Sequence, residues 1–267
     1  MGKVIGVISI KGGVGKTTTV ANLGAILALE FGQRVLLVDA NFSAANLGLH
    51  FGLVNPEATL QDVMADKKKI WEVIHEYSEN FHLIPSHVVP KKVNPLKLKG
   101  KLNLIKDKYD IILLDSSPSL NEELLATMIA ADELLVITSP DYPTLSCTMH
   151  AVKIAKRQGT PITGLILNRV RNKHYEIKTE EVEAATNTPV IGVLPDDVRL
   201  LEALSHTIPA VEHSPFGDAV IEYKKVAAAL VGEHYEDPRF SAKLKRMFVK
   251  DIPKEEINRQ LLRDGTL

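Results

Sequence analysis

The sequence predicts an α/β fold, in which a doubly wound, mostly parallel sheet carries helices on both faces and a helical tail follows at the C-terminus. Two observations support this prediction. Short runs rich in β-branched and other apolar residues recur along the chain, as buried parallel strands require. Segments of helical length separate these runs, so that neighbouring strands and the helix between them form βαβ units.

The strands are expected at the apolar runs, of which the first is KVIGVISI. About seven of them are expected, over residues 3–10, 34–38, 81–85, 110–114, 133–138, 163–167 and 190–194. Helices are expected over residues 17–31, 59–78, 95–108, 121–131, 144–158, 177–187 and 216–234. No linker rich in Gly or Ser divides this pattern, so residues 1–235 are predicted to form one domain and residues 236–267 a polar, charged tail.

The composition excludes several classes of protein. Hydrophobic residues make up 45% of the chain, charged residues 24%, and the net charge is −1, which is typical of a soluble protein without general attraction to nucleic acid. The single cysteine, Cys147, excludes an internal disulfide and any Cys₂ or Cys₄ metal site within one chain. No apolar run approaches the roughly 18 residues of a spanning helix, and residues 1–10 do not resemble a targeting segment. We therefore expect a cytoplasmic protein whose membrane contact is peripheral.

A glycine-rich loop follows the first strand. Residues 11–18 have the sequence KGGVGKTT and lie between a predicted strand and a predicted helix. The glycines allow backbone N–H groups to face phosphate oxygens, and the following helix directs its N-terminal dipole at the same anion. The strict phosphate-loop pattern fails only at its first position, where Ile10 replaces glycine. The alternative is a turn that merely packs a strand on a helix, and two lysines in this setting favour phosphate binding.

The loop predicts binding of ATP with Mg²⁺. Lys16 would bridge the β- and γ-phosphates, and the Thr17 hydroxyl would complete the Mg²⁺ shell. The residues of the loop expected to bind the nucleotide are Lys11, Gly12, Gly13, Val14, Gly15, Lys16, Thr17 and Thr18.

The motif KGGVGKTT resembles the phosphate loop of the deviant Walker A ATPases, the group that contains MinD, ParA and nitrogenase iron protein. The resemblance covers residues 1–235. It implies that ATP drives formation of a homodimer, in which Lys11 reaches the partner's nucleotide and acts on its γ-phosphate like an arginine finger. Lys11 and Lys16 are then both catalytic residues.

Two further motifs resemble the switch regions of this family. Residues 39–47 are similar to the MinD branch, where Asp-x-Asp precedes an Asn-Leu pair, and this implies that Asp39 is catalytic and orders the Mg²⁺ shell. Asn41 stands where the family has the Asp that orients the attacking water. An amide holds water but does not accept its proton, so slow hydrolysis is expected unless another group supplies this role. The D-x-x-x-x-D-x-x-P pattern of residues 110–118 implies that Asp115 is the second carboxylate near Mg²⁺.

The base is expected to contact two turns that resemble the family's adenine-binding turns. These turns are Leu167–Arg169 and Leu194–Asp197, and they predict contacts from Asn168, Arg169, Pro195 and Asp196. The guanine-reading Asn-Lys-x-Asp motif is absent, so ATP is preferred over GTP. Cys147 stands where MinD-like chains usually carry Asp, and it is either a redox-sensing thiol or a plain buried one.

The tail contains a basic amphipathic stretch at residues 239–250. It has five basic residues and no acidic one, and its apolar residues fall on one face of a helix. This pattern is typical of a membrane-surface helix, and MinD proteins end in a similar element. Packing against the domain and docking to a protein partner are the alternatives. Residues 251–267 extend beyond the point where such a targeting helix normally closes the chain.

The motifs together predict a MinD-like ATPase that positions a cellular structure, such as the division site, by cycling on the membrane with an unidentified activating partner. The alternatives are a ParA-like DNA or cargo segregation ATPase, a regulator of flagellar number, and a slow-hydrolysing, nucleotide-gated scaffold. The Pro-Gln-Gly switch of ParA and a clear basic patch are missing, so nucleic acid is the less favoured partner. The single cysteine argues against metal-cluster carriers and against zinc-dependent targeting ATPases.

Overall fold

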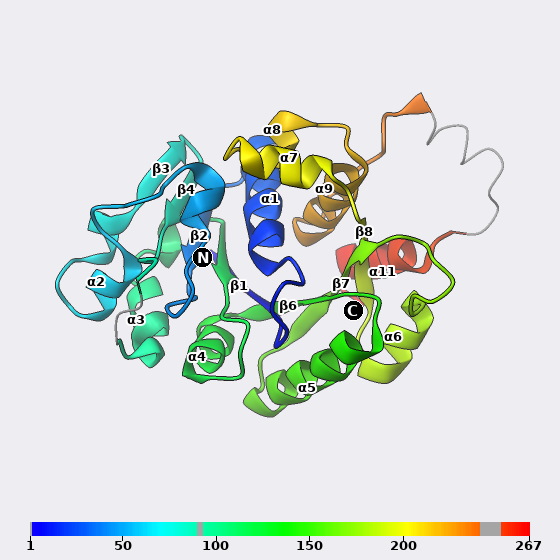
Figure 1. Ribbon diagram of the computed structural model, residues 1–267, viewed down its shortest axis with the longest axis horizontal. Helices are drawn as coiled ribbons and strands as arrows, with labels where there is room; N and C mark the ends of the chain where they lie inside the picture. The colour runs from blue at the N-terminus through cyan, green and yellow to red at the C-terminus, as the bar shows by residue number, and fades with distance from the viewer. Residues whose placement is uncertain (1, 90–92, 241–251) are drawn as a thin grey trace.

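The computed structural model describes residues 2–89, 93–240 and 252–267. Within these residues, eight strands form one central sheet with helices packed on both faces (Figure 1), which confirms the expected α/β fold. The strand order is β3-β4-β2-β5-β1-β6-β7-β8, and only the β3–β4 pair is antiparallel. The strands are β1 (Lys3–Ile8), β2 (Val35–Asp39), β3 (His75–Ser78), β4 (Phe81–Ile84), β5 (Ile111–Asp115), β6 (Glu133–Thr138), β7 (Ile162–Val170) and β8 (Val190–Pro195).

Helices of very different length connect the strands. The α-helices are α1 (Lys16–Leu29), α2 (Leu60–Met64), α3 (Leu98–Leu102), α4 (Glu122–Ala130), α5 (Tyr142–Gln158), α6 (Thr179–Thr186), α7 (Arg199–Ser205), α8 (Ala210–His213), α9 (Asp218–Leu230) and α11 (Lys254–Arg263). The described residues also contain four 3₁₀ turns, namely η1 (Gly48–Phe51), η2 (Ile70–Val73), η3 (Pro95–Lys97) and η4 (Lys106–Lys108).

The central strand β1 serves two hydrophobic cores. Val4 and Ile8 belong to the core formed with α3, α4 and α5, whereas Ile5 and Val7 belong to the core formed with α1 and α9. Figure 1 shows these two helical layers above and below the sheet. Because both faces of the strand are covered, its residues are apolar without alternation, which is why the sequence pattern identified the buried strands.

The single helix expected over residues 59–78 is wrong. Only α2 is helical there, and Asp66, in the left-handed region with a φ of 57°, follows the end of that helix. The chain then makes a 3₁₀ turn and forms β3, an antiparallel edge strand. Tyr77 of this strand packs edge-on against Phe51 and Phe81, with ring centroids 5.3 and 5.4 Å away. Aromatic packing across the sheet edge therefore stabilises an extended conformation.

The helix expected over residues 95–108 is interrupted. Only α3 is α-helical, and 3₁₀ turns precede and follow it. The segment contains Gly100 and Asn103, both weak helix formers. Lys97 and Lys101 both pair with Asp66, which fastens this segment to the end of α2. The short helices α7 and α8 were not predicted.

Helix α9 joins the end of the chain to the helix that follows the glycine-rich loop. The Tyr223 hydroxyl lies 3.1 Å from that of Thr19, and the Lys224 ammonium lies 2.7 Å from the carboxylate of Glu30. Lys224 and Tyr223 are both buried. Helices α1 and α9 therefore share polar contacts as well as the apolar core.

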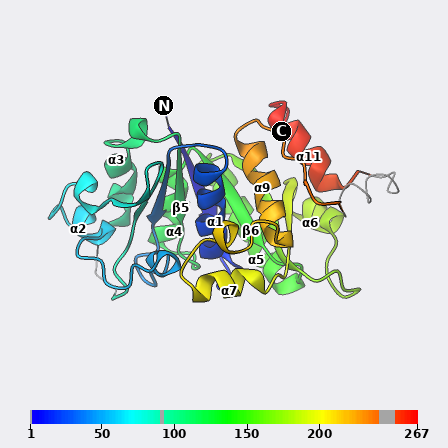
Figure 2. The same cartoon turned by 90° about the horizontal axis from the view of Figure 1, so that it is seen from above.

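The C-terminal helix α11 lies beside α9 and the edge strand β8 (Figure 2). The amphipathic helix expected over residues 239–250 falls largely outside the described residues, because residues 241–251 are not described. The boundary expected at residue 235 stays a prediction. Among the residues that the structure describes, no helix has both the length and the apolar character needed to cross a bilayer.

Candidate nucleotide-binding site

The glycine-rich loop lies at the carboxyl edge of the sheet, where β1 has β5 on one side and β6 on the other. The connections diverge to opposite sides of β1 at this point, and open α/β sheets bind ligands there. Gly13 and Gly15 have φ values of 77° and 95°, which glycine adopts without strain. A Cβ atom at Gly15 would also lie 2.3 Å from the Asn168 amide nitrogen. Backbone conformation and close approach therefore both require glycine at position 15.

Lys16 begins α1 and directs a buried positive charge toward the carboxyl edge of the sheet. Its side chain is almost fully covered. Burial lowers the pKa of Lys16, and the nearby Asp115 carboxylate opposes that effect. A buried ammonium at the N-terminus of a helix is a favourable partner for phosphate oxygens.

Two buried carboxylates stand at neighbouring strand ends. Asp39 closes β2 and Asp115 closes β5, and the two residues lie opposite each other in the parallel register. Both are fully buried. Burial raises the pKa of Asp115 to about 6, and burial together with the Asp115 charge raises the pKa of Asp39 well above its ordinary value. Burial and mutual repulsion therefore disfavour the state in which both carboxylates are ionised, and a bound cation would favour it.

Mg²⁺ fits this pair of carboxylates. One oxygen of Asp115 accepts a hydrogen bond from the Thr17 hydroxyl at 2.7 Å, whereas the other is buried and has no hydrogen-bond partner. Mg²⁺ prefers carboxylate and hydroxyl oxygens. Thr17 and Asp115 would hold the ion, and Asp39, which accepts three backbone N–H groups of residues 41–47, would order its water shell. The ion supplies positive charge to the phosphates when it is bound.

The side chain of Asn41 closes a turn. Its amide nitrogen donates to the Ala44 carbonyl at 2.7 Å, and its amide oxygen accepts from the Ala44 N–H at 3.2 Å. The residue is buried. The amide group is therefore engaged within residues 41–44.

Asn46 belongs to the same site, although the sequence did not single it out. Its amide oxygen accepts a hydrogen bond from the Thr17 hydroxyl at 2.9 Å, and its backbone N–H donates to Asp39. Asn46 thus connects the loop after β2 with the residue expected to bind Mg²⁺. Its place in the Asn-Leu pair was the signal that could have identified it.

Lys11 contacts its own chain at the start of α5. Its ammonium donates to the Thr144 hydroxyl at 2.7 Å and to Asp141 at 3.2 Å. Burial alone would raise the pKa of Asp141, but hydrogen bonds from Thr144 and Ser139 lower it to about 2. Asp141 is the N-cap of α5, and the D-Y-P-T sequence that forms this cap was the missed signal.

Asn168 fastens the end of β7 to the glycine-rich loop. Its amide nitrogen donates to the Val14 carbonyl at 2.7 Å, and its amide oxygen accepts from the backbone N–H of Arg169 at 2.9 Å. Both functions of the amide are therefore used inside the protein. The expected contact between Asn168 and a base stays a prediction, and the structure adds a loop-supporting role.

An ion pair lies next to the two expected base-binding turns. Arg171 lies 2.7 Å from Asp196, which follows Pro195 at the end of β8. Arg169 has a positive φ of 61°, a conformation that is costly for a side chain of this size. A cavity of about 420 Å³ is lined by residues 11–14 and 139–141 and by both arginines. The structure thus places Asn168 and Arg169 beside the loop, whereas Pro195 and Asp196 are not among the residues that line this cavity.

Cys147 lies on α5, in the turn after Thr144, and is partly buried. Among the described residues it is a free thiol. Neither alternative for its role gains support from its surroundings, and both stay predictions.

Comparison with known proteins identifies relatives that cover most of the chain. A family model described as an AAA domain matches residues 2–160. An uncharacterized ATP-binding protein of Methanocaldococcus jannaschii is 37% identical over 239 residues, covering 88% of this chain and 90% of that protein. The sporulation initiation inhibitor protein Soj of Bacillus subtilis is 32% identical, covering 80% and 92%. The septum site-determining protein MinD of Pyrococcus horikoshii, solved with Mg-ADP, matches with a TM-score of 0.81 and 33% identity, covering 86% and 96%.

Proposed function

The chain belongs to the MinD/ParA family of P-loop ATPases, and from that premise we propose that it is an ATP-dependent dimerisation switch of the MinD type. ATP and Mg²⁺ are its cofactors, and ATP hydrolysis is the reaction of its family. In the proposed cycle, the ATP-bound homodimer resides on the membrane surface and positions a cellular structure. Hydrolysis, stimulated by a protein partner, releases it.

The position of Lys11 is the observation that carries the proposal. Lys11 lines the cavity beside the loop, and its side chain is 39% exposed. The buried Lys16 already supplies a cation within the chain. A second, accessible lysine in the same loop is suited to a nucleotide held by a partner chain.

Substitution of Lys11 tests the dimer. We expect Lys11→Ala to bind Mg-ATP as the unchanged chain does and to remain monomeric, because Lys16 stays in place and the cation proposed to reach the partner is lost. Light scattering with ATP, and with ADP as the reference, measures the mass. Lys153→Ala is the matched control, since it removes an exposed lysine from α5. An ATP-dependent dimer of Lys11→Ala would refute the role of Lys11 in the partner's site.

The membrane part of the proposal rests on residues 239–250. Their basic and apolar pattern suits an anionic lipid surface, and the one large apolar side chain of this pattern that the structure describes, Phe240, is 79% exposed. Met247→Glu in the full chain is expected to reduce ATP-dependent sedimentation with phosphatidylglycerol vesicles. Ser241→Glu, which adds the same charge within residues 239–250, is the control. An equal loss of vesicle sedimentation in both variants would indicate an effect of the added charge rather than insertion of the apolar face.

A slow-hydrolysing, nucleotide-gated scaffold is the second candidate. The contacts of Asn41 with Ala44 favour the scaffold. Asn41 stands at the family's water-orienting position, and its amide is already hydrogen-bonded within a turn. Single-turnover measurement of phosphate release separates the candidates. A scaffold would keep its dimer for many minutes after ATP binding, whereas a cycling ATPase would return to monomer as phosphate is released.

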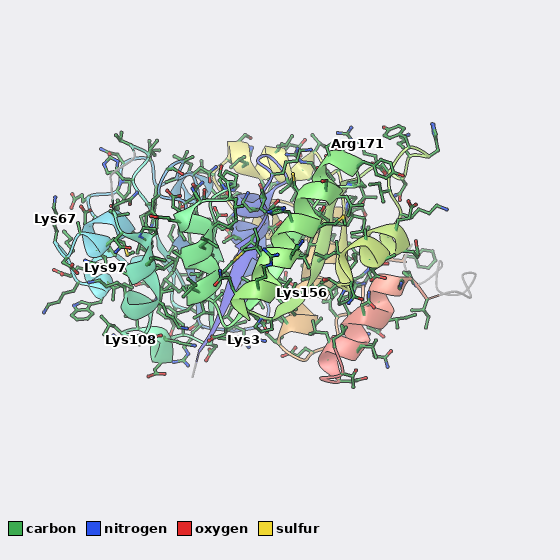
Figure 3. All side chains as sticks on the ribbon, turned by 90° about the horizontal axis from the view of Figure 1, so that it is seen from below. Lys3, Lys67, Lys97, Lys108, Lys156 and Arg171 are labelled. Atoms are coloured by element: carbon green, nitrogen blue, oxygen red, sulfur yellow. The ribbon has the colours of Figure 1, made fainter. Side chains whose placement is uncertain are left out.

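A ParA-like role on DNA receives less support. Figure 3 shows basic side chains spread over several elements of one face. Three of those labelled are paired with carboxylates: Lys3 with Glu133, Lys97 with Asp66, and Arg171 with Asp196. Such pairing lowers the positive potential that a phosphate backbone would meet.

A further inference from the structure

Helices α5 and α6 pack side by side on one face of the sheet (Figure 1), with an open groove between them. The groove has a volume of about 560 Å³ and is lined by α5 from Ser146 to Arg157 and by Ala185 and Thr186 of α6. Because an α-helix rises about 1.5 Å per residue, this stretch of α5 is roughly 16 Å long. None of the described residues that line the groove also lines the cavity beside the glycine-rich loop. The groove is therefore separate from the candidate nucleotide site.

The floor of the groove is apolar. Val152 is buried, and Ala185 packs against the core beneath it. Met149 also lines the groove, and it is 45% exposed. Methionine is flexible and polarizable, so it adapts to the shape of an apolar ligand. The floor therefore favours a ligand that carries apolar groups.

One side of the groove is positively charged. Lys153, Lys156 and Arg157 line it, and their three- and four-residue spacing places them on the same side of α5. The Lys156 ammonium donates to the Asn187 carbonyl at 3.3 Å. The side chains of Lys153 and Arg157 are exposed, and they form no ion pair or hydrogen bond with the residues that the structure describes. Two cations are thus available to a ligand.

The acidic residues of α6 leave these cations unpaired. Glu183, two positions before Ala185, binds Lys254 and Asn258 of α11 and accepts the backbone N–H of Val190. No acidic residue is among the described residues that line the groove. The carboxylates that would neutralise the groove must therefore come from another molecule.

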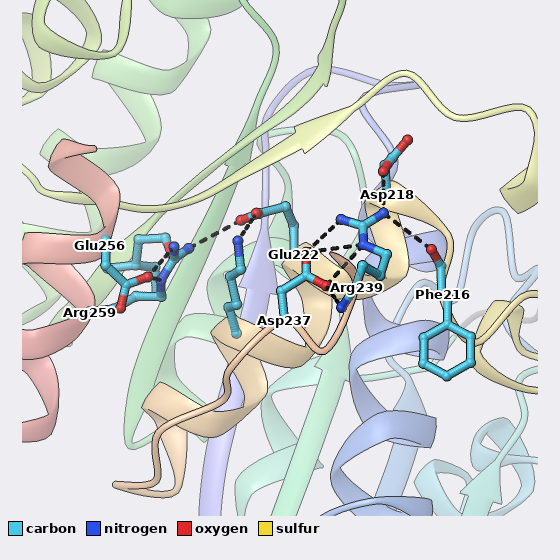
Figure 4. Close-up of polar contacts among 9 residues, drawn as sticks. Phe216, Asp218, Glu222, Asp237, Arg239, Glu256 and Arg259 are labelled. Carbon is cyan, nitrogen blue, oxygen red and sulfur yellow. Dashed lines mark hydrogen bonds and ion pairs between the residues drawn. The ribbon is translucent and has the colours of Figure 1, made fainter. Parts of the chain in front are cut away.

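The arginines beside α9 show the opposite arrangement (Figure 4). Arg239 pairs with Asp218, and Arg259 pairs with Glu222, so both guanidinium groups have carboxylate partners within the chain. Their charges serve to hold the C-terminal segment to α9. The free cations of α5 have no such structural use.

We propose that the groove between α5 and α6 docks an acidic, partly apolar segment of a partner protein. Carboxylates of this segment pair with Lys153 and Arg157, and its apolar side chains cover Met149 and the floor. A small anion would leave most of the length of the groove unused. A nucleic-acid backbone would offer phosphates but no apolar groups for the floor. The inference goes beyond the proposed function, because it involves neither ATP hydrolysis nor the membrane.

A synthetic peptide tests the groove directly. The probe is a fluorescein-labelled peptide of Glu and Leu, patterned so that the Leu residues fall on one face of a helix, and fluorescence anisotropy measures its binding to the full chain. Lys153→Glu combined with Arg157→Glu is expected to weaken binding about tenfold or more, because two attractions become repulsions. Lys67→Glu combined with Lys68→Glu is the matched control. It reverses the same charge at exposed positions, and Figure 3 shows Lys67 far from Lys156.

The apolar part of the proposal has its own test. A peptide in which Ala replaces every Leu keeps the charge but loses apolar contact with the floor, so its binding is expected to be about tenfold weaker or less. Met149→Gln, which removes an exposed apolar side chain from the groove, is expected to weaken the Leu peptide and not the Ala peptide. Nuclear magnetic resonance titration locates the site, with shifts expected in residues 146–157 and 185–186.

The outcomes decide the proposal. Both charge-reversed variants are expected to bind Mg-ATP as the unchanged chain does, which shows that they fold. Loss of peptide binding in the groove variant alone supports the docking site. An equal loss in the control reflects net charge and overturns it, and so does equal binding of the Leu and Ala peptides or no peptide binding at low ionic strength. If a DNA duplex binds more tightly than the peptide and the groove variant loses that binding, the groove is a nucleic-acid site and the proposal is overturned.

Discussion

The Nζ atom of Lys11 lies 3.2 Å from the Oδ1 atom of Asp141 in the same chain. This contact, with the 2.7 Å hydrogen bond to Thr144, keeps the ammonium at the N-terminus of α5. A lysine that serves a partner's nucleotide must leave these ligands first. The monomer and the proposed dimer therefore compete for the same side chain.

Asp141→Asn is expected to lower the ATP concentration at which dimers form. Lys11 and Asp141 are 39% and 44% exposed, so their ion pair contributes only about 0.2–1 kcal/mol, which corresponds to a shift of up to about fivefold. Light scattering over an ATP titration measures the midpoint. Asp107→Asn, at an exposed position in η4, controls for the change in net charge. An unchanged midpoint would show that Asp141 does not restrain Lys11.

Asn168→Ala is expected to weaken the binding of ATP and the binding of GTP by the same factor. The Asn168 amide supports the Val14 carbonyl from within the protein, so its loss disturbs the loop rather than the recognition of a base. A buried acceptor left without its donor costs about 1–3 kcal/mol, or about 5- to 150-fold in affinity. Calorimetric titration with both nucleotides gives the ratio. A loss of affinity for ATP but not for GTP would instead assign base recognition to Asn168.

Asn41→Asp is expected to raise ATP turnover, because it supplies the carboxylate that the switch lacks. A well-placed general base raises the reaction rate by roughly 100-fold or more. The substitution also removes the donor to Ala44, which loosens the turn that holds this side chain away from water. Asn41→Ala loosens the turn without adding a base. Equal phosphate release from the two variants would show that the carboxylate is not the missing element.

The pKa of about 6 for Asp115 predicts that the nucleotide-free protein loses stability as pH rises from about 4 to about 6. The folded chain holds this proton more tightly than the unfolded chain, where the pKa is near 3.8. The stabilising contribution is therefore complete below pH 3.8 and lost through pH 6. Thermal unfolding across this range measures it, and Asp115→Asn should show a shallower decline. Affinity for Mg-ATP should rise over the same interval, because the ion requires the ionised carboxylate.

Local features of the site could be predicted from the sequence. The glycine-rich loop, the strand before it and the helix after it are contiguous in the sequence. Asp39 and Asp115 were located because they stand in motifs that resemble the family's switch regions, and each closes a buried strand. Contacts between distant segments could not be predicted. Asn168 and Val14 are 154 positions apart, and no periodic pattern in the sequence indicates their contact. Asp141 was missed because its role arises only when α5 is packed beside residues 11–14.

The fold could be predicted from the sequence to about the same extent as the site. Strands buried on both faces, such as β1, are continuous apolar runs and stand out in the sequence. The edge strand β3 has a partly exposed pattern, and it forms because Tyr77 packs on Phe51 and Phe81. Helix α11 attaches through Arg259, a residue type that sequence patterns assign to solvent.

The contacts of Tyr223 and Lys224 with α1 have a thermodynamic consequence for the whole molecule. Residues 222–224 of α9 connect Arg259 on one side with Thr19 and Glu30 on the other. If a change at Arg259 shifts α9, the contacts of α9 with Thr19 and Glu30 transmit that shift to α1, the helix that begins at the phosphate-binding loop. Equilibrium coupling is reciprocal, so if ATP changes the affinity of the C-terminal segment for a surface by some factor, that surface changes the affinity for ATP by the same factor. Nucleotide retention would then depend on where in the cell the molecule resides.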